Sequence, residues 1–399
     1  MYIKRELTNI VKKALDAFPA VLVTGPRQSG KTTFLQKEFA GQYGYVSFDD
    51  PLQRQFAVQD ANGFLDQFSG RPLILDEVQY VPELFSYLKI RIDADRQKHG
   101  QFLMTGSQQF HLMKNIGDSL AGRIAILDLL PFNSREIMAV DRKREIAKMV
   151  WYGGYPANIV FPEQRDLWLS SYIRTYVERD VRQLQSIRNI LQFEQFLAIL
   201  AARHGQVLNV AAISRVTGLS QPGCKQWISL LEASYLIFLL KPFYKNFGKR
   251  LMKTPKMYFI DSALAAYLSR QPSSESLWFG AMGGAFFEGF IVTEALKVLA
   301  NQGKQPDLYF WRSSDGLEVD LIILADGRFY PIEIKQTATP TPKHAQGVIS
   351  FRKITGEAQC GTGILVCTVK QKTTMPHNVV ALPWQEFSDW LRKLLSSKA

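Results

Sequence analysis

The chain has 399 residues, more than one typical hydrophobic core needs, so its length predicts two or three domains. Its hydrophobic content of 46% is enough to bury a sizeable core, which excludes a chain that is disordered throughout. The net charge of +12 favours nucleic acid or another anionic surface as a partner.

Cysteine usage and hydropathy narrow the class further. Cys224, Cys360 and Cys367 form no C-x-x-C pair, which argues against a disulfide framework and against a zinc site. No apolar run approaches the length that spans a bilayer, and residues 1–20 indicate a short amphipathic helix rather than a signal peptide. We therefore expect a soluble, cytoplasmic protein without a membrane partner.

Residues 20–33 carry the first functional motif. A predicted strand over 20–23 leads into the sequence Gly-Pro-Arg-Gln-Ser-Gly-Lys-Thr-Thr, and a predicted helix follows over 34–39. In this context G-x-x-x-x-G-K-[ST] binds phosphate, because loop N–H groups and the positive end of the helix dipole face the same oxygens. Lys31 is expected to reach the β- and γ-phosphates and to act in catalysis, and the Thr32 hydroxyl to bind Mg²⁺. The predicted ATP-binding residues here are Gly25, Pro26, Arg27, Gln28, Ser29, Gly30, Lys31, Thr32 and Thr33.

Further strands alternate with helical segments up to residue 150. Apolar runs over 45–48, 72–75, 101–104 and 124–127 predict βαβ units and a parallel sheet, with ligands at the carboxyl ends of the strands. The run 72–75 ends in Asp76 and Glu77. Asp76 is the expected outer ligand of Mg²⁺ and Glu77 the residue that polarises the attacking water, so the pair predicts ATP hydrolysis as well as binding.

Two other polar residues of this region are candidates for contact with the γ-phosphate. Ser107, with Thr105 beside it, follows the strand over 101–104, although Thr-Gly-Ser is also ordinary turn chemistry. Arg123 is a candidate arginine finger or sensor, and a structural arginine is the equal alternative. A finger often acts on the nucleotide of a neighbouring subunit, which implies a homo-oligomer formed through the ATPase domain.

These motifs together resemble a known group. The P-loop, Leu-Asp-Glu-Val-Gln (75–79), Met-Thr-Gly-Ser (104–107), Ser-Leu-Ala-Gly-Arg (119–123) and Leu-Leu-Pro-Phe (129–132) are similar to those of prokaryotic AAA-type ATPases with an uncharacterised C-terminal region. The similarity continues through 153–156, 172–180 and 258–261 and covers nearly the whole chain. It implies the AAA+ fold, with ATP as cofactor.

The middle of the chain predicts a helix-turn-helix. Helices are expected over 166–189 and 192–203, then over 209–217 and 221–232, the last two separated by a glycine turn. The apolar runs 236–240 and 257–260 would form the strands of a wing. Basic residues, among them Arg215, Lys225 and Lys256, interleave with aromatic residues such as Tyr258, which favours contact with DNA. A packing or subunit-contact module is the alternative.

The C-terminal region carries a different set of charged residues. A helix begins near Gly284 and contains Glu288, and strands are predicted over 308–312, 318–324 and 329–335. Because strand side chains alternate, Glu318 and Asp320 share one face, and so do Glu333 and Lys335.

This arrangement resembles the PD-(D/E)XK nuclease core, with Val319 where the family name has proline. The resemblance implies that Asp320, Glu333 and Glu288 hold Mg²⁺ or Mn²⁺, and that Lys335 is catalytic by orienting water or balancing phosphate charge. Exposed charges on an ordinary hairpin are the alternative.

The predicted fold class is α/β, in three parts. Residues 1–150 form an AAA+ P-loop ATPase domain with a parallel sheet, 151–272 a helical linker and winged helix, and 273–399 a PD-(D/E)XK nuclease-like domain. The predicted function is an ATPase that acts on DNA, with a metal-dependent nuclease-like domain. The alternative is an ATP-dependent switch or binding module whose nuclease-like domain is catalytically inactive.

Overall fold

The computed structural model describes residues 1–106, 119–176, 190–243 and 254–396. They divide into two compact units. The first comprises Met1–Phe132 with Ala233–Tyr235 and Leu299–Gln305, and the second comprises Asn133–Glu232, Leu236–Val298 and Pro306–Ala399. Within the described ranges, no helix is both long enough and apolar enough to cross a membrane.

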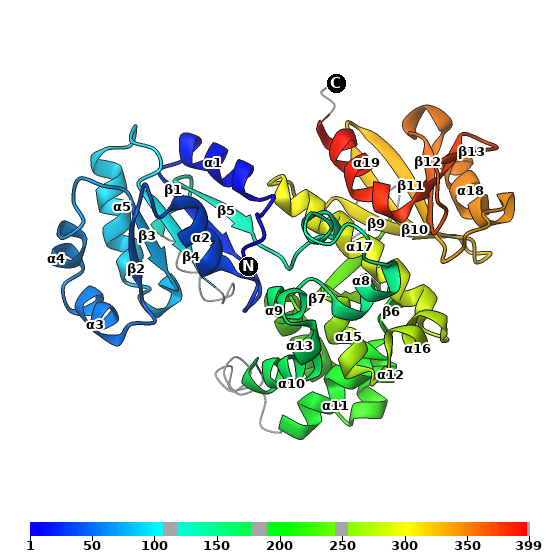
Figure 1. The fold of residues 1–399 in the computed structure, drawn as a ribbon, viewed down its shortest axis with the longest axis horizontal. Coiled ribbons are helices and arrows are strands. Elements are labelled where there is room, and N and C mark those ends of the chain that lie inside the picture. The colour runs from blue at the N-terminus through cyan, green and yellow to red at the C-terminus, as the bar shows by residue number, and fades with distance from the viewer. Residues whose placement is uncertain (107–118, 177–189, 244–253, 397–399) are drawn as a thin grey trace. The chain divides into compact units, whose positions relative to one another are not determined.

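The first unit contains a five-stranded parallel sheet in the order β2-β3-β4-β1-β5, which confirms the predicted parallel α/β fold (Figure 1). Its strands are β1 (Ala20–Thr24), β2 (Gly44–Ser47), β3 (Leu73–Asp76), β4 (Phe102–Thr105) and β5 (Ile124–Asp128). Its helices are α1 (Thr8–Ala17), α2 (Lys31–Phe39), α3 (Pro51–Gln59), α4 (Ala61–Asp66) and α5 (Leu84–Ala94).

Both faces of this sheet are covered. Leu22 packs with Phe64 of α4 and Phe85 of α5 in one core cluster. Val21 points the other way and packs with Phe34 of α2 in a second cluster, which α1 also joins. The central strands β1, β3 and β4 are buried along their whole length and have continuous apolar sequences. The apolar runs located these three strands and also the half-buried edge strands β2 and β5. The polar residues that follow them therefore gather at the carboxyl edge of the sheet.

The second unit is built on one nine-stranded mixed sheet in the order β13-β14-β12-β11-β10-β9-β7-β8-β6. The strands are β6 (Gln206–Val207), β7 (Ile237–Pro242), β8 (Lys256–Phe259), β9 (Leu308–Arg312), β10 (Glu318–Ala325), β11 (Arg328–Ile334), β12 (Gly363–Cys367), β13 (Thr373–Met375) and β14 (Val379–Pro383). The helices are α7 (Ser134–Met138), α8 (Ile146–Tyr152), α9 (Pro156–Val160), α10 (Arg165–Tyr176), α11 (Ile190–Ala201), α12 (Val210–Thr217), α13 (Gln221–Ala233), α15 (Ser262–Leu268), α16 (Ser274–Phe279), α17 (Gly283–Asn301), α18 (Gln346–Thr355) and α19 (Trp384–Ser396).

The middle and C-terminal regions share this sheet. Strands β7 and β8 form an antiparallel pair, and β6 pairs with the other edge of β8. On its free side β7 runs parallel to β9, with Lys241 opposite Tyr309. Backbone hydrogen bonds thus continue from the predicted wing into the predicted nuclease-like strands. The division of this unit at residues 272 and 273 remains a prediction.

Candidate functional sites

The loop between β1 and α2 has the backbone conformation that the motif requires. Gly25 has φ 138° and Gly30 has φ 90°, and Gln28 between them also has a positive φ of 60°. A Cβ atom on Gly25 would lie 2.3 Å from the carbonyl oxygen of Leu129, so no larger residue fits there. Gly30 caps the amino end of α2, whose N–H groups open toward the loop.

The side chains of the loop converge on its mouth. The Lys31 ammonium is 5% exposed and donates to the carbonyl oxygens of Gly25 (3.0 Å) and Pro26 (2.8 Å). Ser29 is buried, and its Oγ has no hydrogen-bond partner among the described residues. A buried hydroxyl without an acceptor, next to an ammonium and a helix amino end, fits a phosphate group.

Asp76 lies at the centre of a hydroxyl network at the carboxyl end of β3. Its Oδ2 accepts from Thr32 Oγ1 (2.9 Å) and from Tyr45 Oη (2.9 Å), and its Oδ1 accepts from Thr105 Oγ1. Burial and the charge of Asp76 raise the pKa of Tyr45 to about 12, so the phenol remains a donor. Thr32 and Asp76, the two predicted magnesium ligands, are therefore in direct contact, and their oxygens suit Mg²⁺.

Glu77 follows in a left-handed conformation, with φ 59°. Its N–H donates to Thr105 Oγ1 (3.0 Å), and its carboxylate accepts from the side-chain amide of Gln79. Strand β4 lies between β1 and β3, so Thr105 at its end joins the two acidic residues. The backbone of Glu77 is therefore held by Thr105, and its carboxylate is held by Gln79.

The second unit gathers acidic residues from a helix and a strand. Glu288 of α17 and Glu318 and Asp320 of β10 each offer a carboxylate oxygen, and these oxygens lie within 4.8 Å of one another. The pairing of β10 with β9 shifts register between Val319 and Ile322, in the segment that contains Asp320. Asp320 Oδ2 also accepts from the N–H of Ile334 on β11 (2.9 Å).

Glu333 and Lys335 lie beside this group, on and just after β11. The Lys335 ammonium is 2.7 Å from Glu333 Oε1 and 3.7 Å from Asp320 Oδ2. Burial and the charge of Asp320 raise the pKa of Glu333 to about 8, and the same two causes raise that of Glu288 to about 7. Burial lowers the pKa of Lys335, but Asp320 and Glu333 outweigh it and raise the value to about 12. The structure thus brings together all four residues predicted from the nuclease resemblance.

A residue not predicted for this site lies among its carboxylates. Lys256 of β8 is 4% exposed, and its Nζ is 2.8 Å from Glu288 Oε1 and 3.8 Å from Asp320 Oδ1. It also pairs with Glu318. Burial opposes its charge, but the three carboxylates outweigh burial and raise the pKa of Lys256. The donor set suits a divalent cation, yet with this ammonium among the carboxylates the arrangement does not fit a metal ion there.

This finding corrects part of the predicted DNA surface. Lys256 and Tyr258 were counted among its basic and aromatic residues, but both are buried, because both side chains turn toward Glu288. Arg215 of α12 and Lys225 of α13 are exposed as expected. The basic residues between 244 and 253 lie outside the described residues.

Comparisons with known proteins cover all three regions. Residues 17–138 match the model of an AAA domain. Over these residues the chain is similar to that family, and they are called the AAA-type ATPase domain here. Residues 143–275 and 283–387 match two domains of unknown function, DUF8612 and DUF4143. The AAA-type ATPase domain accounts for the nucleotide-binding motifs, and the other matches assign no activity.

Relatives of the whole chain are themselves uncharacterised. Proteins of Mycobacterium tuberculosis and Mycobacterium bovis are each 29% identical over 387 residues, which is 95% of this chain and 83% of each relative. A protein of Methanocaldococcus jannaschii is 24% identical and covers 77% of this chain and 72% of its own length. Among solved structures, a Walker-type ATPase of Pyrococcus abyssi is 15% identical, with a TM-score of 0.44 over 67% of this chain and 96% of its own.

The two residues predicted to contact the γ-phosphate, Ser107 and Arg123, have different outcomes. Ser107 lies outside the described residues. Arg123 precedes β5 and so lies at the amino edge of the sheet, away from the P-loop at the carboxyl edge. There its guanidinium forms two hydrogen bonds with Asp93 (2.8 and 3.0 Å). These bonds, together with one from Arg96, lower the pKa of Asp93 to about 2. Within its own domain Arg123 therefore has a structural role, which is the alternative to the role of arginine finger or sensor.

Arg5 supports the P-loop and was missed. It is buried and donates to the carbonyl oxygens of Ser29 (2.9 Å) and Leu130 (2.5 Å), with its guanidinium over the Phe132 ring. In the sequence, Arg5 is one of four basic residues in the amphipathic segment 1–20, and nothing there marks it as a support of the P-loop. Its two partners are 24 and 125 positions away, so no local pattern reveals these contacts.

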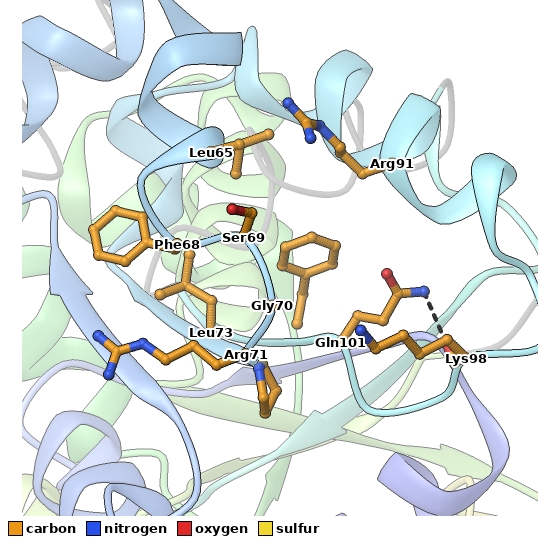
Figure 2. A pocket seen from close by; sticks show the side chains of 11 residues that line it. Leu65, Phe68, Ser69, Gly70, Arg71, Leu73, Arg91, Lys98 and Gln101 are labelled. Atoms are coloured by element: carbon orange, nitrogen blue, oxygen red, sulfur yellow. Dashed lines mark hydrogen bonds between the residues drawn. The ribbon is translucent and has the colours of Figure 1, made fainter.

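A pocket of about 170 Å³ in the AAA-type ATPase domain is a different place from the nucleotide site (Figure 2). Leu73 and Phe102, the first residues of β3 and β4, line it together with Arg71, Arg91 and Lys98. It therefore lies at the amino edge of the sheet, opposite the P-loop.

Proposed function

We propose that the AAA-type ATPase domain hydrolyses ATP with Lys31, Thr32, Asp76 and Glu77. The contact of Thr32 with Asp76, beside the loop ammonium, carries this proposal. Mg²⁺ bound with ATP neutralises phosphate charge. Lys31 binds phosphate oxygens, Thr32 and Asp76 hold the metal, and Glu77 accepts the proton of the attacking water.

The test measures ATP binding and turnover in Lys31→Ala and Glu77→Gln. Lys31→Ala should weaken binding, because the ammonium contacts the phosphates. Glu77→Gln should keep binding and lower turnover about a hundredfold or more, because a general base contributes at least that much. Glu83→Gln, an exposed glutamate at the start of α5, is the matched control. Normal turnover in Glu77→Gln would reject the assigned base.

We also propose that the protein acts on DNA through the helix-turn-helix of α12 and α13. Two features support this: Gly218 between them has φ 70°, as a tight turn needs, and Arg215 and Lys225 are exposed. The order α11, β6, α12, α13, β7 and β8 supports a winged helix.

Salt-dependent binding to duplex DNA tests this partner. Each lysine that neutralises a phosphate contributes about 0.9 to the slope of log affinity against log salt. Lys225→Ala should reduce the slope by that amount, whereas Lys372→Ala, another exposed lysine, should not. Equal slopes for Lys225→Ala and wild type would favour the packing or subunit-contact role.

A second candidate function, DNA cleavage by the C-terminal domain, is favoured by the convergence of Glu288, Asp320, Glu333 and Lys335 on α17, β10 and β11. Supercoiled plasmid with Mg²⁺ or Mn²⁺, with and without ATP, distinguishes it from an inactive binding module. Cleavage by wild type but not by Asp320→Ala supports a nuclease. No cleavage in any condition supports the switch or binding module.

We further propose that ATP hydrolysis is coupled to the action of the C-terminal domain on DNA. ATP hydrolysis would gate the access of DNA to the C-terminal site, in a homo-oligomer in which Arg123 reaches a neighbouring nucleotide. If Glu77→Gln leaves DNA processing and nucleotide-dependent assembly unchanged, this coupling is absent.

A further inference from the structure

We infer that Lys256 is the resident cation of the carboxylate cluster, and that its ammonium and a divalent metal ion are mutually exclusive occupants of that cluster. The cluster is Glu288, Glu318 and Asp320. This inference concerns the site of the proposed nuclease and rests on that proposal only for its biological meaning.

The Lys256 ammonium lies where a metal ion would bind. Lys256 Nζ is 2.8 Å from Glu288 Oε1 and pairs with Glu318, so it uses the oxygens that a metal ion would bind. An Mg²⁺ ion lies about 2.1 Å from each ligand oxygen, and Mn²⁺ is held in the same kind of oxygen site. With three carboxylate oxygens within 4.8 Å, a metal ion would lie almost against the ammonium. Two positive charges so close in a buried site repel strongly.

The Lys256 ammonium also balances the negative charge of the carboxylate cluster. Glu333 and Lys335 extend the cluster to four carboxylates and two ammonium groups. Removing Lys256 leaves the buried Asp320 (4% exposed) and Glu333 (6% exposed) with Lys335. Glu318 keeps only the more distant guanidinium of Arg312, at 3.7 Å. Buried carboxylates need a compensating charge, so the loss of Lys256 creates a demand that a divalent cation meets.

Strand β8, which carries Lys256, contributes a second contact to the cluster. Two residues along β8, on the same face, the Tyr258 hydroxyl donates to Glu288 Oε1 (2.5 Å). The Lys256 ammonium also lies 5.6 Å from the ring centre of Phe310 on β9. Lysine and tyrosine together hold Glu288 toward the predicted wing. A metal ion can therefore occupy the cluster only when the lysine does not.

The test measures Mn²⁺ binding by calorimetry without nucleotide, in wild type, Lys256→Met and Lys256→Arg. Lys256→Met should bind one Mn²⁺ about tenfold or more tightly than wild type, because a repelling charge has gone. Adding Asp320→Asn to it should abolish that gain, which separates this site from Thr32 and Asp76. Lys256→Arg keeps the charge and should bind as weakly as wild type. Equal binding by wild type and Lys256→Met, or a gain that persists with Asp320→Asn, would overturn the inference.

Folding of Lys256→Met gives a second measurement. Its thermal midpoint should rise with added Mn²⁺ while that of wild type does not, and folding only in the presence of Mn²⁺ would support the inference equally. A variant that stays unfolded in Mn²⁺ would contradict it, since the metal should replace the missing charge. Tight Mn²⁺ binding without plasmid cleavage would reject the nuclease and leave the inference standing.

Discussion

Thr105 is the residue on which both acidic groups of the ATP site depend. Its hydroxyl donates to Asp76 and accepts from the N–H of Glu77. The hydroxyls of Thr32 and Tyr45 donate to the other oxygen of the Asp76 carboxylate. Because a hydroxyl that donates to a carboxylate also orients it, Thr105 positions the metal ligand and the base together.

We expect Thr105→Val to lower ATP turnover about tenfold while ATP affinity changes little. Valine has the same shape but lacks the hydroxyl that donates to Asp76 and accepts from the N–H of Glu77. A hydrogen bond to a charged group such as Asp76 contributes about 1.5–3 kcal/mol, which corresponds to about tenfold or more in rate. Steady-state hydrolysis and nucleotide titration measure the two effects. Thr105→Ser keeps the oxygen and should restore most of the turnover. A loss of affinity equal to the loss of turnover would contradict a role in positioning.

Two of the three glycines of helix α17, Gly284 and Gly289, have opposite surroundings. A Cβ atom on Gly289 would lie 2.0 Å from Nε2 of His204, whereas one on Gly284 would have no atom within 4 Å. His204 is buried, and burial lowers its pKa to about 3, so a neutral ring packs against the helix. The close approach fixes where Glu288, one residue earlier, meets the sheet.

Gly289→Ala should lower the free energy of unfolding of the second unit by about 1–3 kcal/mol, because overpacking a buried contact costs that much. Gly284→Ala should leave it unchanged or raise it by up to about 1 kcal/mol, the gain in helix propensity. All seven tryptophans belong to the second unit, so tryptophan fluorescence during denaturation reports it alone. Equal effects of the two substitutions would contradict this prediction, because they would mean that the His204 ring can move aside without lowering the free energy of unfolding.

The sequence predicted elements and motifs well where the signal is local. Continuous apolar runs located the five parallel strands, and the P-loop and the Asp76-Glu77 pair needed only a strand before them. Contacts between distant segments could be predicted only where a motif or a family resemblance links them. Lys256 is 32 positions from Glu288 and 64 from Asp320, so it was counted as one more surface charge. Its burial depends on β8 joining the sheet of β9 and β10, which no local pattern reveals.

At the scale of the whole molecule, the carboxylate cluster makes stability depend on pH. Glu288 and Glu333 have pKa values raised to about 7 and about 8 from 4.5, so the folded protein keeps protons that the unfolded chain has released. The free energy of unfolding should therefore fall as pH rises from about 4.5 through 8.

Denaturation of the metal-free protein across this pH range, in wild type and Glu333→Gln, checks the effect. The variant should show a shallower decline, by at most about 1.4 kcal/mol per pH unit for one proton. Glu386→Gln, an exposed glutamate of α19, should behave as wild type. A stability that rises over this range, or equal slopes in wild type and Glu333→Gln, would contradict the prediction.

The continuous nine-stranded sheet limits how the chain can be cut or recombined. A fragment that starts at residue 273 would keep β9 but lose β7, and the backbone groups that pair Lys241 with Tyr309 would become a bare edge open to other chains. The same cut would remove Lys256 and leave the acidic residues with Lys335 and Arg312 as their counter-charges. Domain shuffling, in evolution or in the laboratory, would therefore have to move β6, β7 and β8 together with the C-terminal strands.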